Sequence, residues 1–179
     1  YDEACDYVLK SLAPLGKEYT DIAKEAFQNR WVDKYENKGK RSGAYSWSTY
    51  GIPHPYILMN YVENINSLFT LAHELGHAMH SYFSHKNQPF IYSDYSIFVA
   101  EVASTVNESL LMQYLLKTTD DPTFKRYLMN YFMDQFRSTL YRQTMFAEFE
   151  KEVHLFAQKG GGLTSSYPVS YTHLRAHET

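Results

Sequence analysis

The chain has 179 residues, 44% of them hydrophobic and 21% charged, so it can bury a core and does not have the composition of a disordered polymer. Its net charge is -3 at pH 7 and it contains no long basic run, which argues against binding to nucleic acid or to a membrane surface. No stretch approaches the ~20 apolar residues that a transmembrane helix needs.

The first third of the chain is predicted to form two helices followed by two short strands. Apolar residues at helical spacing indicate helices over about residues 2–12 and 16–34, which Pro14-Leu15-Gly16 separates. The runs 45–50 and 56–62 favour strands, and the Gly- and Pro-rich segment between them predicts a hairpin. Because two strands alone are only marginally stable, we expect helices to pack on them.

Two further helices are predicted after the strands, over about residues 67–84 and 96–117. Asn66 or Ser67 is the expected N-cap of the first of them. The apolar positions of the second recur at helical spacing and are Val99, Val102, Val106, Leu110 and Leu111.

The last part of the chain is predicted to be one long helical segment. Asp121 followed by Pro122 is typical of a helix start, and the helical pattern continues to Lys159 before three consecutive glycines. A segment of that length predicts a kink or a break within it. The sequence as a whole therefore predicts a mainly α fold with a small β-hairpin or sheet.

The run His73-Glu74-Leu75-Gly76-His77 lies in the helix predicted over 67–84 and has the spacing of a zinc peptidase motif. His73 and His77 are four residues apart, so both imidazoles project from one face of a helix and can reach one tetrahedral ion. Glu74 is turned by about 100° from His73, which directs its carboxylate to a water molecule on that ion. We therefore predict one Zn²⁺ per chain, with Glu74 as the general base. The alternative is a coincidental match on a solvated helix.

Glu101 is the candidate for the third protein ligand that a zinc site needs. It interrupts the apolar run 98–103, where an acidic side chain is costly to bury unless it is paired or bound to metal. A buried ion pair is the alternative. Glu108 lies two turns further along the same side and is predicted to hold a ligand imidazole as a hydrogen-bond acceptor. A solvated helix residue or a structural ion pair is the alternative. His80 is more typical of local packing than of a ligand.

Four segments of the chain match, in order, the motifs of a known family. They are residues 39–46, 69–80, 98–105 and 142–150. Through them the chain resembles oligoendopeptidase F and its relatives among the thimet-oligopeptidase-like zinc metallopeptidases. The resemblance implies a helical, zincin-type catalytic core, a sheet near the active site, and cleavage of short, unfolded peptides. It implies that His73, His77 and Glu101 bind the zinc ion and that the residue after His73 is the base.

Two features of that family have no counterpart in the sequence. One is a segment rich in His and Tyr beyond the Gly-rich stretch, thought to bind substrate and to stabilise the oxyanion. The other is most of a large helical region before this core. We therefore expect residues 1–168 to be a partial catalytic domain, truncated at both ends, and the absence of an initiator Met agrees with that expectation. The alternative function is a zinc-binding fragment that is catalytically incomplete.

Residues 169–179 are interpreted as a non-native tail, because they resemble the conceptual translation of a sequencing-library adapter. His173 and His177 have metal-ligand spacing, but this interpretation removes them from the candidate site. Gly43 and Ala44 precede the first predicted strand and could mark an edge that pairs with a substrate backbone. A flexible loop is the alternative for these two residues.

The single cysteine, Cys5, excludes an internal disulfide and favours a reducing compartment. The expected location is therefore the cytoplasm. The expected partners are short peptide substrates, with neither nucleic acid nor a membrane among them.

Overall fold

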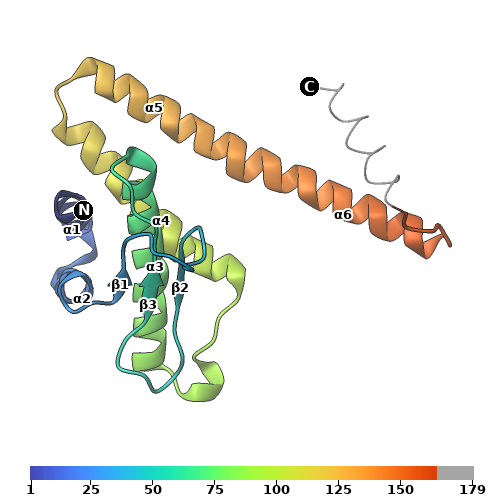
Figure 1. Ribbon diagram of the computed structural model, residues 1–179, viewed down its shortest axis with the longest axis horizontal. Coiled ribbons are helices and arrows are strands. Elements are labelled where there is room, and N and C mark those ends of the chain that lie inside the picture. Colours follow the sequence, from blue (N-terminus) through green and yellow to red (C-terminus); the bar gives the residue numbers. More distant parts are fainter. Residues whose placement is uncertain (165–179) are drawn as a thin grey trace. The chain divides into compact units, whose positions relative to one another are not determined.

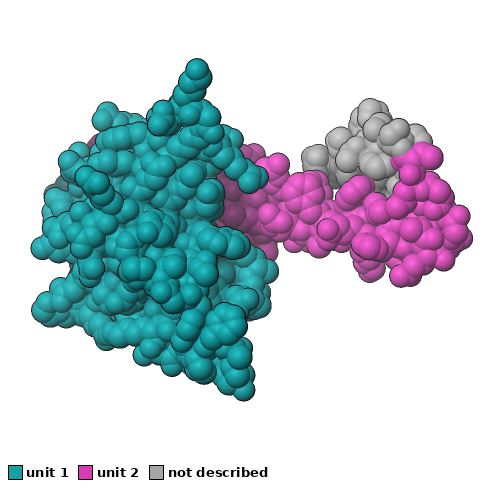
Figure 2. Space-filling view, turned by 60° about the horizontal axis from the view of Figure 1, so that its bottom comes forward, with its two compact units in different colours: residues 1–120 teal, residues 121–179 magenta. Residues whose placement is uncertain are grey.

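The computed structural model describes residues 1–164, and the chain divides into two compact units, Tyr1–Asp120 and Asp121–Thr179 (Figure 2). The predicted mainly α fold with a small sheet is confirmed (Figure 1). The expectation for residues 169–179, His173 and His177 included, lies outside the described residues. Among residues 1–164, no helix has both the length and the apolar character that crossing a membrane requires.

The first unit combines four main helices, two 3-10 helices and three short strands. The main helices are α1 (Asp2–Ser11), α2 (Lys17–Gln28), α3 (Ile65–Asn87) and α4 (Ile97–Thr118). The 3-10 helices are η1 (Ala13–Leu15) and η2 (Phe90–Tyr92). The strands are β1 (Val32–Asp33), β2 (Tyr45–Trp47) and β3 (Tyr56–Leu58). Helix α3 is the centre of this unit, since it packs against α1, α2, α4 and two of the strands.

The sheet has the order β1-β3-β2, so β2 is an edge strand. The predicted hairpin is confirmed by the antiparallel pairing of β2 with β3, in which Ser46 lies opposite Ile57. The third strand, β1, pairs in parallel with β3 and was not predicted. The helix expected over 16–34 ends at Gln28 instead, because Arg30 adopts a φ of 63°, outside the right-handed helical region.

Helix α3 begins two residues earlier than the sequence predicts. Its N-cap is Asn64, whose side chain accepts a hydrogen bond of 2.8 Å from the Ser67 backbone N–H, so the predicted caps at Asn66 and Ser67 are wrong. The helix is buried on more than one side. Its buried residues include Leu68, Leu71, Ala72, Leu75 and Met79 and also Phe69, Glu74, Gly76 and Ala78.

Only part of the apolar stripe of α4 is buried, since Leu111 is fully buried but the three valines are not. Val99, Val102 and Val106 are between 42% and 50% exposed. The buried positions of this helix are Ala100, Ser104, Asn107, Leu111, Met112 and Leu115. The stripe that carries small and polar residues therefore faces the core, and the valine stripe does not.

The close approach of α3 and α4 explains this burial. A Cβ atom placed on Gly76 would lie 2.6 Å from the Ser104 Cα and 2.8 Å from the Ala103 carbonyl oxygen. Only small residues fit at such a crossing. Asn107 is also held there, because its side chain donates to the Ala72 carbonyl at 3.2 Å and accepts from the Tyr19 hydroxyl at 3.1 Å. The stripe turned toward α3 is the one that carries Glu101 and Glu108.

The second unit consists of α5 (Pro122–Phe136), a π-helical segment η3 (Arg137–Tyr141) and α6 (Arg142–Gln158). Asp121 caps α5 as predicted, since its carboxylate accepts a 2.8 Å hydrogen bond from the Thr123 backbone N–H. The predicted interruption is confirmed as η3, where the helix changes its hydrogen-bond pattern. Gly160 follows the end of α6 with a φ of 83°, as a glycine C-cap does.

Candidate metal centre

Three side chains from α3 and α4 bring their ligand atoms to one point. The Nε2 atoms of His73 and His77 are 3.0 Å apart. The Glu101 Oε2 atom lies 3.5 Å from the first of these nitrogens and 3.7 Å from the second. A tetrahedral zinc ion with ligands at about 2.0–2.1 Å separates those ligands by roughly 3.3 Å. The three atoms therefore match the spacing of a single bound ion, which is the group that the sequence predicted.

Glu108 holds the ring of His73. The Oε1 atom of Glu108 is 2.6 Å from the His73 Nδ1 atom, so a proton on Nδ1 leaves Nε2 free to bind a metal. Burial lowers the pKa of His73, but the hydrogen bond to Glu108 and the charges of nearby carboxylates outweigh it and raise that pKa. Glu108 therefore lies where the sequence predicted an acceptor for a ligand imidazole.

Ser104 holds the third candidate ligand, and sequence reasoning missed this contact. Its hydroxyl donates to the Glu101 Oε2 atom at 3.1 Å. It is also within 3.1 Å of the Glu101 carbonyl oxygen, one turn before it on the same helix. The spacing of three residues between Glu101 and Ser104 was the signal that could have indicated the contact.

Glu74 is buried beside the cluster, with only 7% of its surface exposed. Its Oε2 atom has no hydrogen-bond partner among residues 1–164. Burial raises the pKa of its carboxyl to about 7, although the charge of His73 and a hydrogen bond with the Ser46 backbone oppose the shift. A buried carboxylate oxygen without a partner is costly, so this position suits an atom that accepts a hydrogen bond from a water molecule.

His77 and His80 lie one turn apart on α3 in different surroundings. Burial and the neighbouring His73 lower the pKa of His77, which favours the neutral form that binds metals. The ring of His80 stacks on Tyr95, with ring centroids 3.7 Å apart and an interplanar angle of 14°. His80 is outside the three-residue cluster, so the structure agrees with the packing role that we expected for it.

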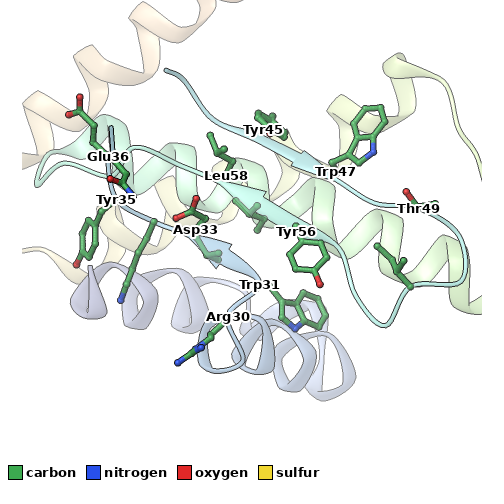
Figure 3. A pocket seen from close by; sticks show the side chains of 15 residues that line it. Arg30, Trp31, Asp33, Tyr35, Glu36, Tyr45, Trp47, Thr49, Tyr56 and Leu58 are labelled. Carbon is green, nitrogen blue, oxygen red and sulfur yellow. The ribbon is translucent and has the colours of Figure 1, made fainter. Parts of the chain in front are cut away.

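A groove of about 710 Å³ extends from His77 between β2 and the segment 90–100, and we call it the His77 groove. A second cavity, of about 890 Å³, is lined by side chains of β1, β2 and β3 and of the segments next to them (Figure 3). Tyr45, Tyr56 and Leu58 belong to that second cavity, and none of the metal-cluster residues does. Of these two cavities, only the His77 groove includes a residue of the metal cluster.

The sequence model of Peptidase family M3 matches residues 8–177 of the chain. The chain belongs to peptidase family M3. The predicted resemblance to oligoendopeptidase F is confirmed, because curated proteins of that name are among the similar sequences.

Relatives of this M3 chain match it over most of its length. It is 59% identical to Oligopeptidase PepF of Bacillus subtilis (strain 168), over 92% of this chain and 24% of that protein. It is 53% identical to an Oligoendopeptidase F homolog of Borreliella burgdorferi, over 89% of this chain and 27% of that protein. A crystal structure from Chlamydophila abortus, 48% identical, matches with a TM-score of 0.77 over 93% of this chain and 28% of that one. The chain thus spans about a quarter of the length of these relatives.

Replacing Glu108 with glutamine is expected to weaken zinc binding by about 10- to 100-fold. The amide keeps an acceptor for the His73 Nδ1–H, but it removes the negative charge that makes the imidazole a stronger ligand. The dissociation constant would be measured by competition with a chromophoric chelator. Glu63→Gln is the matched control, since Glu63 is exposed and lies outside the cluster. Equal zinc affinity in the two variants would contradict the role of Glu108.

In the metal-free chain, Glu74 is expected to lower the free energy of unfolding as the pH rises from about 4.5 to about 7. Its carboxyl has a pKa of about 7 in the folded chain and an ordinary value of 4.5 otherwise, so within this window the folded state holds a proton that the unfolded state has lost. Urea unfolding with a chelator present should therefore show Glu74→Gln gaining stability over the unmodified chain across the window, by on the order of 3 kcal/mol. A constant difference between the two proteins would contradict the raised pKa.

Proposed function

We propose that this chain carries the catalytic metal site of an oligopeptidase and hydrolyses short peptides with one zinc ion, held by His73, His77 and Glu101. The observation that carries the proposal is the convergence of three ligand atoms, 3.0 to 3.7 Å apart, beside a buried carboxylate. Membership of peptidase family M3 supports it. The single buried cysteine supports a reducing, cytoplasmic setting.

The proposed chemistry divides between the ion and the chain. A bound zinc ion would polarise the peptide carbonyl and lower the pKa of a water molecule. Glu74 accepts the proton of that water at its carboxylate and then delivers it to the leaving amine. Glu108 and Ser104 keep the His73 ring and the Glu101 carboxylate in place, through the contacts at 2.6 and 3.1 Å.

The open edge of β2 is a suitable place for the substrate backbone. The backbone N–H groups of Ile57 and Met59 donate to the carbonyl oxygens of Trp31 and Asp33, at 2.8 Å each. The backbone groups of Tyr56 and Leu58, which alternate with them in β3, therefore point toward β2. Tyr45 and Trp47 are paired with those alternate residues, and the backbone of Ser46 between them points to the open edge. This geometry favours pairing with substrate, which is one of the two interpretations of Gly43 and Ala44, although the open backbone lies within the strand.

A second candidate is a chain that binds zinc without cleaving peptides. The observation that favours it is length, since the chain spans only 24% and 27% of two curated relatives. Residues outside the matched quarter of those proteins could supply groups that bind substrate and stabilise the oxyanion. The two candidates share the same zinc site, so they differ only in turnover.

One experiment separates these candidates. The purified chain would be loaded with zinc, its metal content measured by atomic emission, and its activity measured with a quenched fluorescent peptide. One equivalent of zinc with cleavage supports the peptidase, one equivalent without cleavage supports the second candidate, and no stoichiometric zinc contradicts both. His77→Ala should abolish zinc binding, whereas His85→Ala, two turns further along α3 and outside the cluster, should retain it.

A further inference from the structure

We propose that Asn107 is a positioning residue of the metal centre, which fixes α4 on α3 at the point where Glu108 reaches His73. This inference rests on the proposed function, because the property that the residue sets is the affinity of the chain for zinc. It assigns an effect on metal binding to a buried amide that touches none of the three candidate ligands.

Two hydrogen bonds join neighbouring residues of α3 to neighbouring residues of α4, which pack against each other (Figure 1). The Asn107 Nδ2 atom donates to the Ala72 carbonyl oxygen at 3.2 Å. The next residue on each helix makes the second contact, 2.6 Å between the Glu108 Oε1 atom and the His73 Nδ1 atom. A shift of α4 that breaks the first bond therefore moves the residue that makes the second.

The crossing at Gly76 supplies one fixed point between the two helices, against the backbone of Ser104. Asn107 supplies a second fixed point, about one turn further along α4. Apolar packing is non-directional and permits small rotations and sliding about a single crossing, whereas a hydrogen bond has a preferred length and angle. We therefore attribute the position of Glu108 to Asn107 and not to the glycine crossing alone.

The amide of Asn107 is held from both sides. The Ala72 carbonyl can only accept, so the NH₂ group faces it and the Oδ1 atom faces Tyr19. The Tyr19 hydroxyl donates to that Oδ1 atom at 3.1 Å. Burial raises the pKa of Tyr19 to about 12, so the hydroxyl keeps its proton at neutral pH. The Tyr19 ring stacks on Phe83 of α3, with centroids 6.0 Å apart, so the donor is itself fixed in place.

The burial of Asn107 indicates that its contribution is geometric. The residue is only 1% exposed. Burying an amide is costly, and its hydrogen bonds replace bonds to water with little net gain, so an apolar side chain could fill the same space at least as stably. The feature that an apolar side chain lacks is the directed bond to the Ala72 carbonyl. Zinc affinity and fold stability should therefore respond differently to its loss.

Two variants of Asn107 test this separation. Asn107→Ala removes both hydrogen bonds and leaves space, and Asn107→Leu removes them and fills the space. Each is expected to weaken zinc binding by about tenfold, measured by competition with a chromophoric chelator. Leu115→Ala is the matched control, because Leu115 is a buried residue of α4 about two turns beyond Asn107. It should lower the urea midpoint of unfolding and keep the zinc affinity of the unmodified chain.

A combined variant shows through which residue Asn107 acts. If it positions Glu108, Asn107→Ala should weaken zinc binding by less than about threefold when Glu108→Gln is already present. A full tenfold loss in that background would mean that the two residues act independently, and would overturn the proposal. Tyr19→Phe removes only the hydroxyl that holds the amide, and should weaken zinc binding by about threefold.

The contact that Asn107 positions can be observed without metal. In the metal-free chain, the proton between His73 Nδ1 and the Glu108 carboxylate should give a downfield proton NMR signal, assigned by its loss in His73→Ala. The signal should disappear in both Asn107 variants and persist in Leu115→Ala. A general loss of stability would not produce this pattern in chains that remain folded.

The outcomes separate this inference from the proposed function. If the signal disappears in the Asn107 variants of a chain that holds no stoichiometric zinc, the positioning of His73 stands and the metal-dependent function is refuted. Equal zinc affinity with and without the Asn107 amide, or an equal loss in Leu115→Ala, would overturn the positioning role and leave the function intact. A signal that persists in both Asn107 variants would also overturn that role.

Discussion

Replacing Glu74 with glutamine should lower peptide cleavage by about 10²- to 10⁴-fold while leaving zinc bound. The amide has nearly the same shape as the carboxylate and can occupy the same buried position. It cannot take a proton from water near neutral pH, so the proposed base is lost. The change would be measured as kcat with a quenched peptide, in a zinc-loaded polypeptide that contains this chain and cleaves peptides.

The metal content of the same preparation decides how the result is interpreted. Glu74 is not one of the three clustered residues, so the zinc stoichiometry should not change. Glu25→Gln is the matched control, because Glu25 is an exposed residue of α2 and should change neither quantity. A Glu74→Gln protein that cleaves peptides at the unmodified rate would refute the proposed base. One that has lost its zinc would indicate that Glu74 supports the metal site instead.

The convergence of the cluster was predictable because most of it is set by helix geometry. His73 and His77 share a face whenever residues 65–87 are helical, since they are one turn apart. Glu101 and Glu108 share a face of α4 for the same reason. The spacing of residues along each helix does not give the distance between the two helices. The only indirect signal of that distance was Glu101, an acidic residue within an apolar run.

The inward face of α4 was not predictable from its hydrophobic pattern. Val99, Val102 and Val106 have the helical spacing of a core stripe, yet the structure leaves them exposed. Burial on a helix depends on the neighbour that it meets, and here the neighbour presents a glycine and requires small residues opposite it. Ser104 and Asn107 lie on this buried face, but in the sequence such polar residues are typical of a solvent-exposed stripe.

The third strand was missed for a different reason. β1 contains only Val32 and Asp33, which is too short to show the alternation that predicts a strand. It exists because β3 pairs with it, through contacts such as the 2.8 Å hydrogen bond from the Ile57 backbone N–H to the Trp31 carbonyl. Pairing between residues so far apart in sequence has no local signal. For this reason the predicted helix over 16–34 extended beyond the observed end of α2 at Gln28 and included the residues of β1.

Gly76 permits the contact between α3 and α4, so Gly76→Ala is expected to damage both the fold and the zinc site. The new methyl group would lie 2.6 Å from the Ser104 Cα and 2.8 Å from the Ala103 carbonyl oxygen. Both are backbone atoms, so no side-chain rotation can relieve the overlap, and α4 would have to move by roughly 1 Å to reach normal contact distance. That movement carries Glu101 away from the two histidines, whose Nε2 atoms now lie within 3.7 Å of its carboxylate.

The two effects of Gly76→Ala have opposite signs in stability, and overpacking should dominate. Alanine favours a helix over glycine by about 1 kcal/mol. Overpacking against backbone costs about 1–3 kcal/mol, and this overlap is severe. We therefore expect a lower free energy of unfolding in urea and a zinc affinity at least tenfold weaker, since ligand positions tolerate little displacement. Gly162→Ala is the matched control, because a Cβ atom there has no neighbour within 4 Å. A Gly76→Ala chain with unchanged stability and zinc affinity would contradict the close approach of the two helices.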